Sequence, residues 1–207
     1  MILQLRFKIT TERVGFAVQP FDGTYGVDLD FNELGEGPLT IGVSACLSGH
    51  LCNYRGQDNP FELVQELMRL SAAHGVRWEP FCPEQVTMGT PREPMNIVGG
   101  DGADVLAGRA KVLTHGGSDV TDHMIRGAEG FVQVCRSKRI NLVLLMEGSP
   151  SCGSHWIYDG ELWPKKMKRR GVGVATAMLL SHGISVVSPL DEKALFRLRQ
   201  HILGPRK

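Results

Sequence analysis

The chain has 207 residues, of which 42% are hydrophobic and 22% charged, and its formal net charge at pH 7 is +1. This size and composition fit one globular domain with a small appendage, and the near-neutral charge is unlike the basic excess of a dedicated nucleic-acid-binding protein. No apolar run reaches the roughly 18 to 20 residues that span a bilayer, and the charged N-terminus lacks the apolar stretch of a signal peptide. We therefore expect a cytoplasmic protein with no membrane partner.

Residues 1–38 alternate apolar and polar side chains, which is the period of half-buried β-strands. Asp22 and Gly23 form a turn signal inside this stretch, and the segment 35–38 ends it. The sequence predicts a small N-terminal β appendage at 1–38, followed by a main domain at 39–207.

In the main domain, short apolar strands alternate with amphipathic helices. The first helix is expected to open at Asn59, as N-cap, with Pro60 as its first residue, and to close at Gly75. This alternation predicts βαβ units and a Rossmann-like α/β fold, in which a mostly parallel sheet is flanked by helices on both faces. The strands are expected at 39–43, 76–81, 141–146 and 184–187, and the later helices at 121–139, 171–182 and 191–202.

Two further segments have a distinctive composition. The stretch 99–117 is rich in glycine and is expected to form a lid or a strand pair over the site. Lysine and arginine crowd the segment 165–170, which we interpret as a solvated loop face, with contact to RNA as the alternative.

Three cysteines follow three of the predicted parallel strands. Cys46, Cys82 and Cys152 come at or just after the strands at 39–43, 76–81 and 141–146. The carboxyl ends of parallel strands share one edge of a sheet, where ligands bind in open α/β folds, so these three thiols are expected to converge. Cys135 lies inside a predicted helix and is expected to fill core. Cys52 is close in sequence to Cys46 and is not assigned.

The chemistry of three converging thiols leaves several interpretations open. Cytoplasmic cysteines stay reduced, which disfavours disulfides. Structural zinc sites favour closely spaced cysteine pairs and four protein ligands, and no such pair is present. Three thiolates without an evident fourth ligand fit a 4Fe-4S cluster with one open iron, although thiolates also bind zinc and buried cysteines often only pack.

Several motifs resemble those of the thiouracil desulfidase family. The resemblance runs from about residue 40 to residue 189, and residues 1–38 fall outside it. Its elements are VSACLSGHLCNYRG at 43–56, FCPEQVTMGTPREP at 81–94, DVTDHMIRGA at 119–128, SPSCG at 149–153 and IYDG at 157–160.

The resemblance implies an enzyme that removes sulfur from 2-thiouracil-like bases and yields uracil and sulfide. It implies a 4Fe-4S cluster held by Cys46, Cys82 and Cys152, whose unligated iron takes the sulfur of a small thiolated base. Glu84 and Ser149 match the family's candidate catalytic positions.

Three more residues are candidates for substrate binding. Arg92 is expected to pair with a substrate carbonyl or to hold Glu84, and Tyr54 to stack on the base or line the core. Ser151 is a candidate for the same role as Ser149, which is to orient the base or relay a proton. Two alternative functions stay open: desulfuration of thionucleosides or thiolated tRNA, and a non-enzymatic zinc or iron–sulfur binding module. The sequence assigns no oligomeric state.

Overall fold

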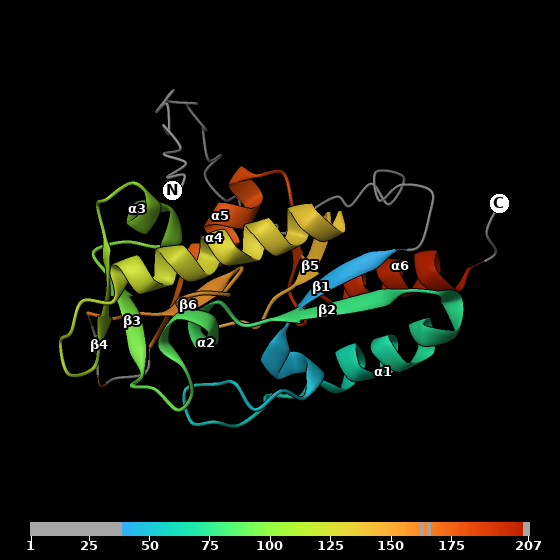
Figure 1. Ribbon diagram of the computed structural model, residues 1–207, viewed down its shortest axis with the longest axis horizontal. Helices are drawn as coiled ribbons and strands as arrows, with labels where there is room; N and C mark the ends of the chain where they lie inside the picture. Colours follow the sequence, from blue (N-terminus) through green and yellow to red (C-terminus); the bar gives the residue numbers. More distant parts are fainter. Residues whose placement is uncertain (1–38, 162–163, 165–166, 205–207) are drawn as a thin grey trace, which may run out of the picture.

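The computed structural model describes residues 39–161, 164 and 167–204 (Figure 1). The predicted β appendage at 1–38 lies outside the described residues, as do Lys165 and Lys166 of the basic segment. Among the described residues, no helix is long and apolar enough to cross a membrane.

A four-stranded parallel sheet forms the centre of the fold, in the order β2-β1-β5-β8. Its register pairs Thr40 with Arg77, Gly42 with Val143, and Leu142 with Ser185. The predicted α/β fold with a mostly parallel sheet is therefore confirmed. The strands are β1 (Thr40–Ser44), β2 (Arg77–Phe81), β5 (Leu142–Leu144) and β8 (Ser185–Val187).

Helices cover both faces of the sheet. Alternate residues of a strand point to opposite faces, and in β5 the residues on both faces are apolar and need helices to bury them. Leu142 and Leu144 of β5 pack in one core with α1 and α6, whereas Val143 packs in the second core with α4 and α5. Buried strands of this kind are apolar on both sides. The four helices are α1 (Glu62–Ser71), α4 (Thr121–Lys138), α5 (Val174–Ser181) and α6 (Glu192–Leu203).

The predicted start of the first helix is wrong. Helix α1 begins at Glu62, and its N-cap is Phe61, which makes no side-chain capping bond. Asn59 is instead tied to the segment after β1: its backbone N–H donates to the Cys46 carbonyl at 3.0 Å, and its side-chain oxygen accepts from Asn53 Nδ2 at 3.5 Å. These contacts keep Asn59 out of the helix. A short 3₁₀ turn, η3 (Ala72–His74), then leads to Gly75, whose φ of 74° ends the element as expected.

The helix predicted at 171–182 begins three residues late, at Val174. The preceding residues form strand β7 (Lys168–Arg170), which pairs antiparallel with β6 (Trp156–Tyr158). The described part of the basic segment is thus a strand and not a loop.

The glycine-rich stretch 99–117 connects and completes a strand pair, which is one of the two forms expected for it. Strand β3 (Met95–Val98) pairs antiparallel with β4 (Lys111–Thr114), and the short helix α3 (Gly102–Leu106) lies between them in the chain. Figure 1 shows this pair beside the end of the main sheet towards which β1 and β2 run.

A close backbone contact positions the short helix α2 (Pro83–Met88) against α4. A Cβ atom added at Gly127 of α4 would lie 2.1 Å from the Pro83 carbonyl oxygen. Pro83 directly follows Cys82, so the absence of a side chain at Gly127 lets this candidate ligand segment sit directly on α4.

We expect Gly127→Ala to destabilise the fold by about 1–3 kcal/mol, because backbone atoms at such a contact cannot yield without moving the helices apart. Gly130 in the same helix is the matched control, since its added Cβ would lie 3.4 Å from the Phe81 ring, an ordinary contact. Gly130→Ala should be neutral or stabilising by up to about 1 kcal/mol. Urea unfolding of both variants measures the difference, and equal midpoints would contradict the steric role of Gly127.

Candidate active site

A pocket of about 410 Å³ opens where β1, β2 and β5 end. Its volume lies in the range of small-molecule sites. The structure brings every candidate residue named from the sequence to its wall: Cys46, Tyr54, Cys82, Glu84, Arg92, Ser149, Ser151 and Cys152.

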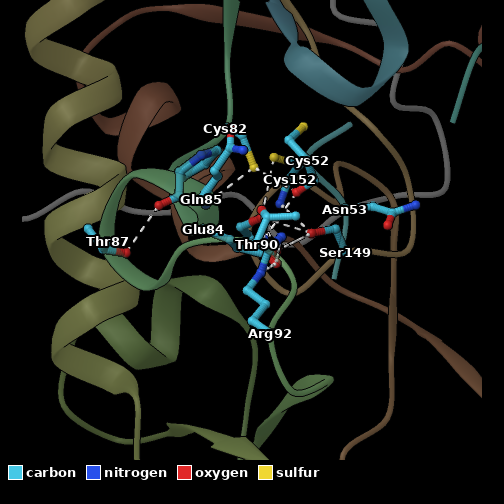
Figure 2. A network of polar contacts seen from close by, with 12 residues as sticks. Cys52, Asn53, Cys82, Glu84, Gln85, Thr87, Thr90, Arg92, Ser149 and Cys152 are labelled. Carbon is cyan, nitrogen blue, oxygen red and sulfur yellow. Dashed lines mark hydrogen bonds and ion pairs between the residues drawn. The ribbon is translucent and has the colours of Figure 1, made fainter. Parts of the chain in front are cut away.

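The three candidate ligand thiols reach the pocket from three different elements. Cys46 lies in η2 (Ala45–Ser48), the 3₁₀ turn after β1. Cys82 is the N-cap of α2, and its sulfur accepts a hydrogen bond from the Gln85 N–H at 3.4 Å (Figure 2). Cys152 lies in the loop between β5 and β6 and is 5% exposed. The predicted convergence of the thiols at one edge of the sheet is thus present.

Cys52 is a fourth thiol in the same pocket, which the sequence left unassigned. It is fully buried, and Figure 2 shows it beside Cys82 and Cys152. A hydrogen bond with Cys46, together with burial, raises the pKa of Cys52 to about 11, against a lowering effect of Cys82. Within the described part of the chain, no three His, Cys, Asp or Glu side chains are placed to hold a single metal ion. The thiols therefore line a cavity instead of forming a compact mononuclear site.

Two of the candidate ligand thiols, Cys82 and Cys152, have a raised pKa in this arrangement. Burial raises the pKa of Cys152 to about 12, and a hydrogen bond with Cys52 followed by burial raises the pKa of Cys82 far above its usual range. Thiolates are the form that binds metal, so metal binding here releases protons. Cys135, by contrast, is buried in the core among α4 and its neighbours, away from the pocket.

Glu84 is the centre of a polar network that joins both sides of the pocket (Figure 2). Its Oε2 accepts from Arg92 Nε at 2.9 Å and Nη2 at 2.6 Å. Its Oε1 accepts from the hydroxyls of Ser151 at 2.6 Å and Ser149 at 3.0 Å. The carboxylate is thus held between a cation and two hydroxyl groups.

Arg92 also donates from Nη1 to groups of the protein. Its Nη1 donates to the carbonyls of Cys52 and Gly89 and to the Thr90 hydroxyl, at 3.0, 2.9 and 3.1 Å, and its side chain is 6% exposed. Of its two predicted roles, this favours holding Glu84 over binding a substrate carbonyl. Tyr54 lines the pocket half-buried, with the Arg55 guanidinium 5.1 Å from its ring centre.

The loop that carries Ser149, Ser151 and Cys152 is fixed against the start of α5. Val174 N–H donates to the Pro150 carbonyl, and Thr176 donates its hydroxyl to the Cys152 carbonyl at 2.9 Å. A Cβ added at Gly173 would lie 2.4 Å from the Ser151 carbonyl group. Ser151 also lies between Glu84 and Cys152, with its Oγ 3.4 Å from the Cys152 sulfur.

Glu147 is a pocket residue that the sequence analysis missed. Its carboxylate accepts from the backbone N–H groups of Ser154, His155 and Trp156, from the Ser154 hydroxyl and from His155 Nδ1 at 2.8 Å. Burial raises the pKa of Glu147, but these hydrogen bonds outweigh it and lower the pKa to about 2. Its position two residues before Ser149 is the signal from which the sequence could have identified Glu147 as a pocket residue.

We expect Glu147 to stabilise the fold in a pH-dependent way. A carboxyl whose pKa falls from 4.5 to about 2 on folding stabilises the fold above pH 4.5, and this contribution is lost as the pH falls towards 2. Between pH 5 and pH 3 the loss amounts to about 2 kcal/mol. Urea unfolding measures the free energy of unfolding at pH 5 and at pH 3. Between these pH values it should fall by about 2 kcal/mol less in Glu147→Gln than in the wild type. An equal drop in both proteins would contradict the lowered pKa.

Comparisons with known proteins relate most of the described domain to one family. The profile of the family described as 2-thiouracil desulfurase matches residues 41–191. The chain is 40% identical over 147 residues to the uncharacterized protein YbbK of Bacillus subtilis (strain 168), a match that covers 70% of this chain and 93% of that protein. A solved structure of the 4Fe-4S-dependent thiouracil desulfidase TudS is similar with a TM-score of 0.64 and 38% identity, over 77% of this chain and 96% of that one. The matched range contains the four pocket thiols and the residues of the Glu84 network. Because the profile matches most of the chain, the chain belongs to the 2-thiouracil desulfurase family.

Proposed function

We propose that this protein is a 4Fe-4S-dependent desulfidase that hydrolyses the C–S bond of 2-thiouracil-like bases to give uracil and sulfide. The observation that carries the proposal is the presence of Cys46, Cys82 and Cys152 in one pocket with the Glu84 network. A soft-metal site and an acid–base group thereby share one small-molecule cavity.

The residues present fit an iron–sulfur cluster. Thiols are the ligands that such clusters prefer, and three of them reach the pocket from the ends of three parallel strands. We assign the ligand role to Cys46, Cys82 and Cys152. The Gln85 N–H and the Ser151 hydroxyl, which already contact the sulfurs of Cys82 and Cys152, would then serve as hydrogen-bond partners of the ligand sulfurs.

When bound, the cluster supplies an open, thiophilic iron that polarises the thiocarbonyl group of the base. The protein's own residues then accept and donate the protons of the reaction. Arg92 holds the Glu84 carboxylate on its Oε2, so that Oε1 keeps a fixed position next to Ser149 and Ser151.

Glu84 and Ser149 form a path for the proton of the attacking water. Ser149 takes a proton from water at its Oγ while it gives its own proton to Glu84 Oε1, the atom it already contacts at 3.0 Å. The protonated Glu84 gives that proton to the departing sulfur. The second proton of the attacking water then leaves the C2 oxygen through Ser149 to Glu84 as the C2 carbonyl forms, so that water and the thiocarbonyl group become uracil, hydrosulfide and one proton. Ser151, 2% exposed, orients the same carboxylate oxygen.

Metal content tests the cofactor. After anaerobic reconstitution, the wild type should contain iron and acid-labile sulfide in equal amounts and little zinc, and it should release sulfide from 2-thiouracil. Cys152→Ala should lose most of its iron and its activity, because one of three ligands is missing. Cys135→Ala, a buried cysteine remote from the pocket, is the matched control and should keep both. One zinc per chain with no iron in the wild type would refute the proposal.

Glu84→Gln tests the acid–base role. Sulfide release from 2-thiouracil should fall by about 10²- to 10⁴-fold, because the amide cannot accept the proton, whereas the iron content should stay at the wild-type level. Glu66→Gln, on the exposed side of α1, is the control. A Glu84→Gln protein that keeps its full rate would exclude Glu84 as the acid–base group.

A further inference from the structure

A buried amide lies in the wall of the pocket and has no part in the chemistry described above. Asn96 is 7% exposed and lines the pocket together with His115. Its neighbours in β3, Met95 and Ile97, point into the core that packs against α4 and α5. Because alternate residues of a strand face opposite sides, Asn96 lies on the face of β3 away from that core.

The strand pair places Asn96 apart from the thiols. The three candidate ligand thiols come from the end of the main sheet. Asn96 comes from β3, and His115 follows its partner strand β4. The His115 N–H donates to the Pro94 carbonyl at 2.9 Å, which continues the pairing of the two strands. Asn96 therefore belongs to a two-stranded element that is separate from the main sheet (Figure 1). Asn96 and His115 of this element line the pocket.

Asn96 has hydrogen-bonding capacity for a ligand. A primary amide offers two N–H donors and an acceptor oxygen. Among the described residues, one side-chain contact is found: Nδ2 lies 3.2 Å from His115 Nε2. With the amide as donor, Nε2 accepts and the imidazole proton is on Nδ1. His115 thereby fixes the rotation of the amide and leaves one N–H and the oxygen for a ligand in the pocket.

We infer that Asn96 recognises the edge of a pyrimidine-dione ring at which an N–H donor lies beside a carbonyl acceptor. In 2-thiouracil this edge is formed by N3–H and the C4 carbonyl, next to the thiocarbonyl carbon. An amide is complementary to it: the Asn96 oxygen accepts from N3–H, and the remaining N–H donates to the C4 oxygen. This assignment rests on the proposed function, and it makes Asn96 the specificity residue of the same pocket.

Asn53, another asparagine of the pocket wall, is committed to the loop after β1. Its Oδ1 accepts from the N–H groups of Arg55 and Gln57, and its Nδ2 donates to the Asp58 carbonyl and to Asn59 Oδ1. These contacts hold the loop in place and use both ends of the Asn53 amide. Asn96, unlike Asn53, keeps a donor and an acceptor for a base.

Ligand binding tests this inference without relying on turnover. Titration calorimetry on the cluster-loaded protein compares uracil with 2-hydroxypyrimidine, which in its 2-oxo form keeps one ring N–H but lacks the C4 carbonyl. The wild type should bind uracil about 10- to 100-fold more tightly. In Asn96→Ala this preference should vanish. The isosteric Asn96→Asp, which accepts but cannot donate to the C4 oxygen, should lose most of it while keeping the wall filled.

Kinetics on 2-thiouracil provides a second readout. Both Asn96 variants should raise KM by about 10- to 100-fold and leave kcat within about threefold, because the Asn96 contacts are made equally in the bound substrate and in the transition state. Asn141→Ala, an exposed asparagine just before β5, is the matched control and should behave as the wild type.

The possible outcomes separate this inference from the proposed function. Wild-type protein that prefers uracil but releases no sulfide from 2-thiouracil would refute the proposed reaction and support the pyrimidine subsite. Protein that releases sulfide but keeps the full preference for uracil in Asn96→Asp would overturn the role of Asn96 alone. A wild type that binds uracil no better than 2-hydroxypyrimidine would overturn it as well.

Discussion

The paired charges of Glu84 and Arg92 connect the separate segments from which the pocket is built. Glu84 belongs to α2, Arg92 to the segment between α2 and β3, and the two serines that contact Glu84 to the loop after β5. The pair is largely buried, with side chains 11% and 6% exposed. A buried carboxylate is tolerated only when it is paired and hydrogen-bonded, so the position of each segment depends on the others.

This dependence extends to the thiols. Ser151 contacts both the Glu84 carboxylate and the Cys152 sulfur, and Arg92 donates to the Cys52 carbonyl. The charged network and the thiols therefore share backbone segments, and neither can shift alone. In the proposed reaction, the same coupling would hold the acid–base group at a fixed position relative to the cysteines that would bind the cluster.

The sequence predicted the general architecture well, because it depends on local patterns. Apolar strands alternating with helices predicted a parallel sheet, and cysteines placed after three strands predicted thiols at one edge. Glu84 and Ser149 came from motif resemblance, and Arg92 was a candidate for binding substrate or holding Glu84. The structure places all three in one network. Their chemical roles, and the ligand roles of the cysteines, stay predictions.

Other features depend on contacts between distant segments, which one sequence does not reveal. Asn59 has the residue type of an N-cap, but its contacts with Cys46 and Asn53 delay the helix. Cys52 and Glu147 gain their surroundings only through the folded pocket. Asn96 stands in an apolar strand, and the pocket that it faces is made by elements far from it in the chain.

The distances in sequence between the three ligand candidates have a consequence for the folding of the chain. The differences 82 − 46 and 152 − 82 give spacings of 36 and 70 residues. A cluster held by Cys46, Cys82 and Cys152 would act as a three-way crosslink that closes two long loops. In the chain-entropy description of crosslinks, closing a loop of this length lowers the free energy of the folded state relative to the unfolded chain by about 4 kcal/mol. The cluster would thus also restrict the unfolded chain. Loss of iron would then lower the stability of the fold as well as the activity.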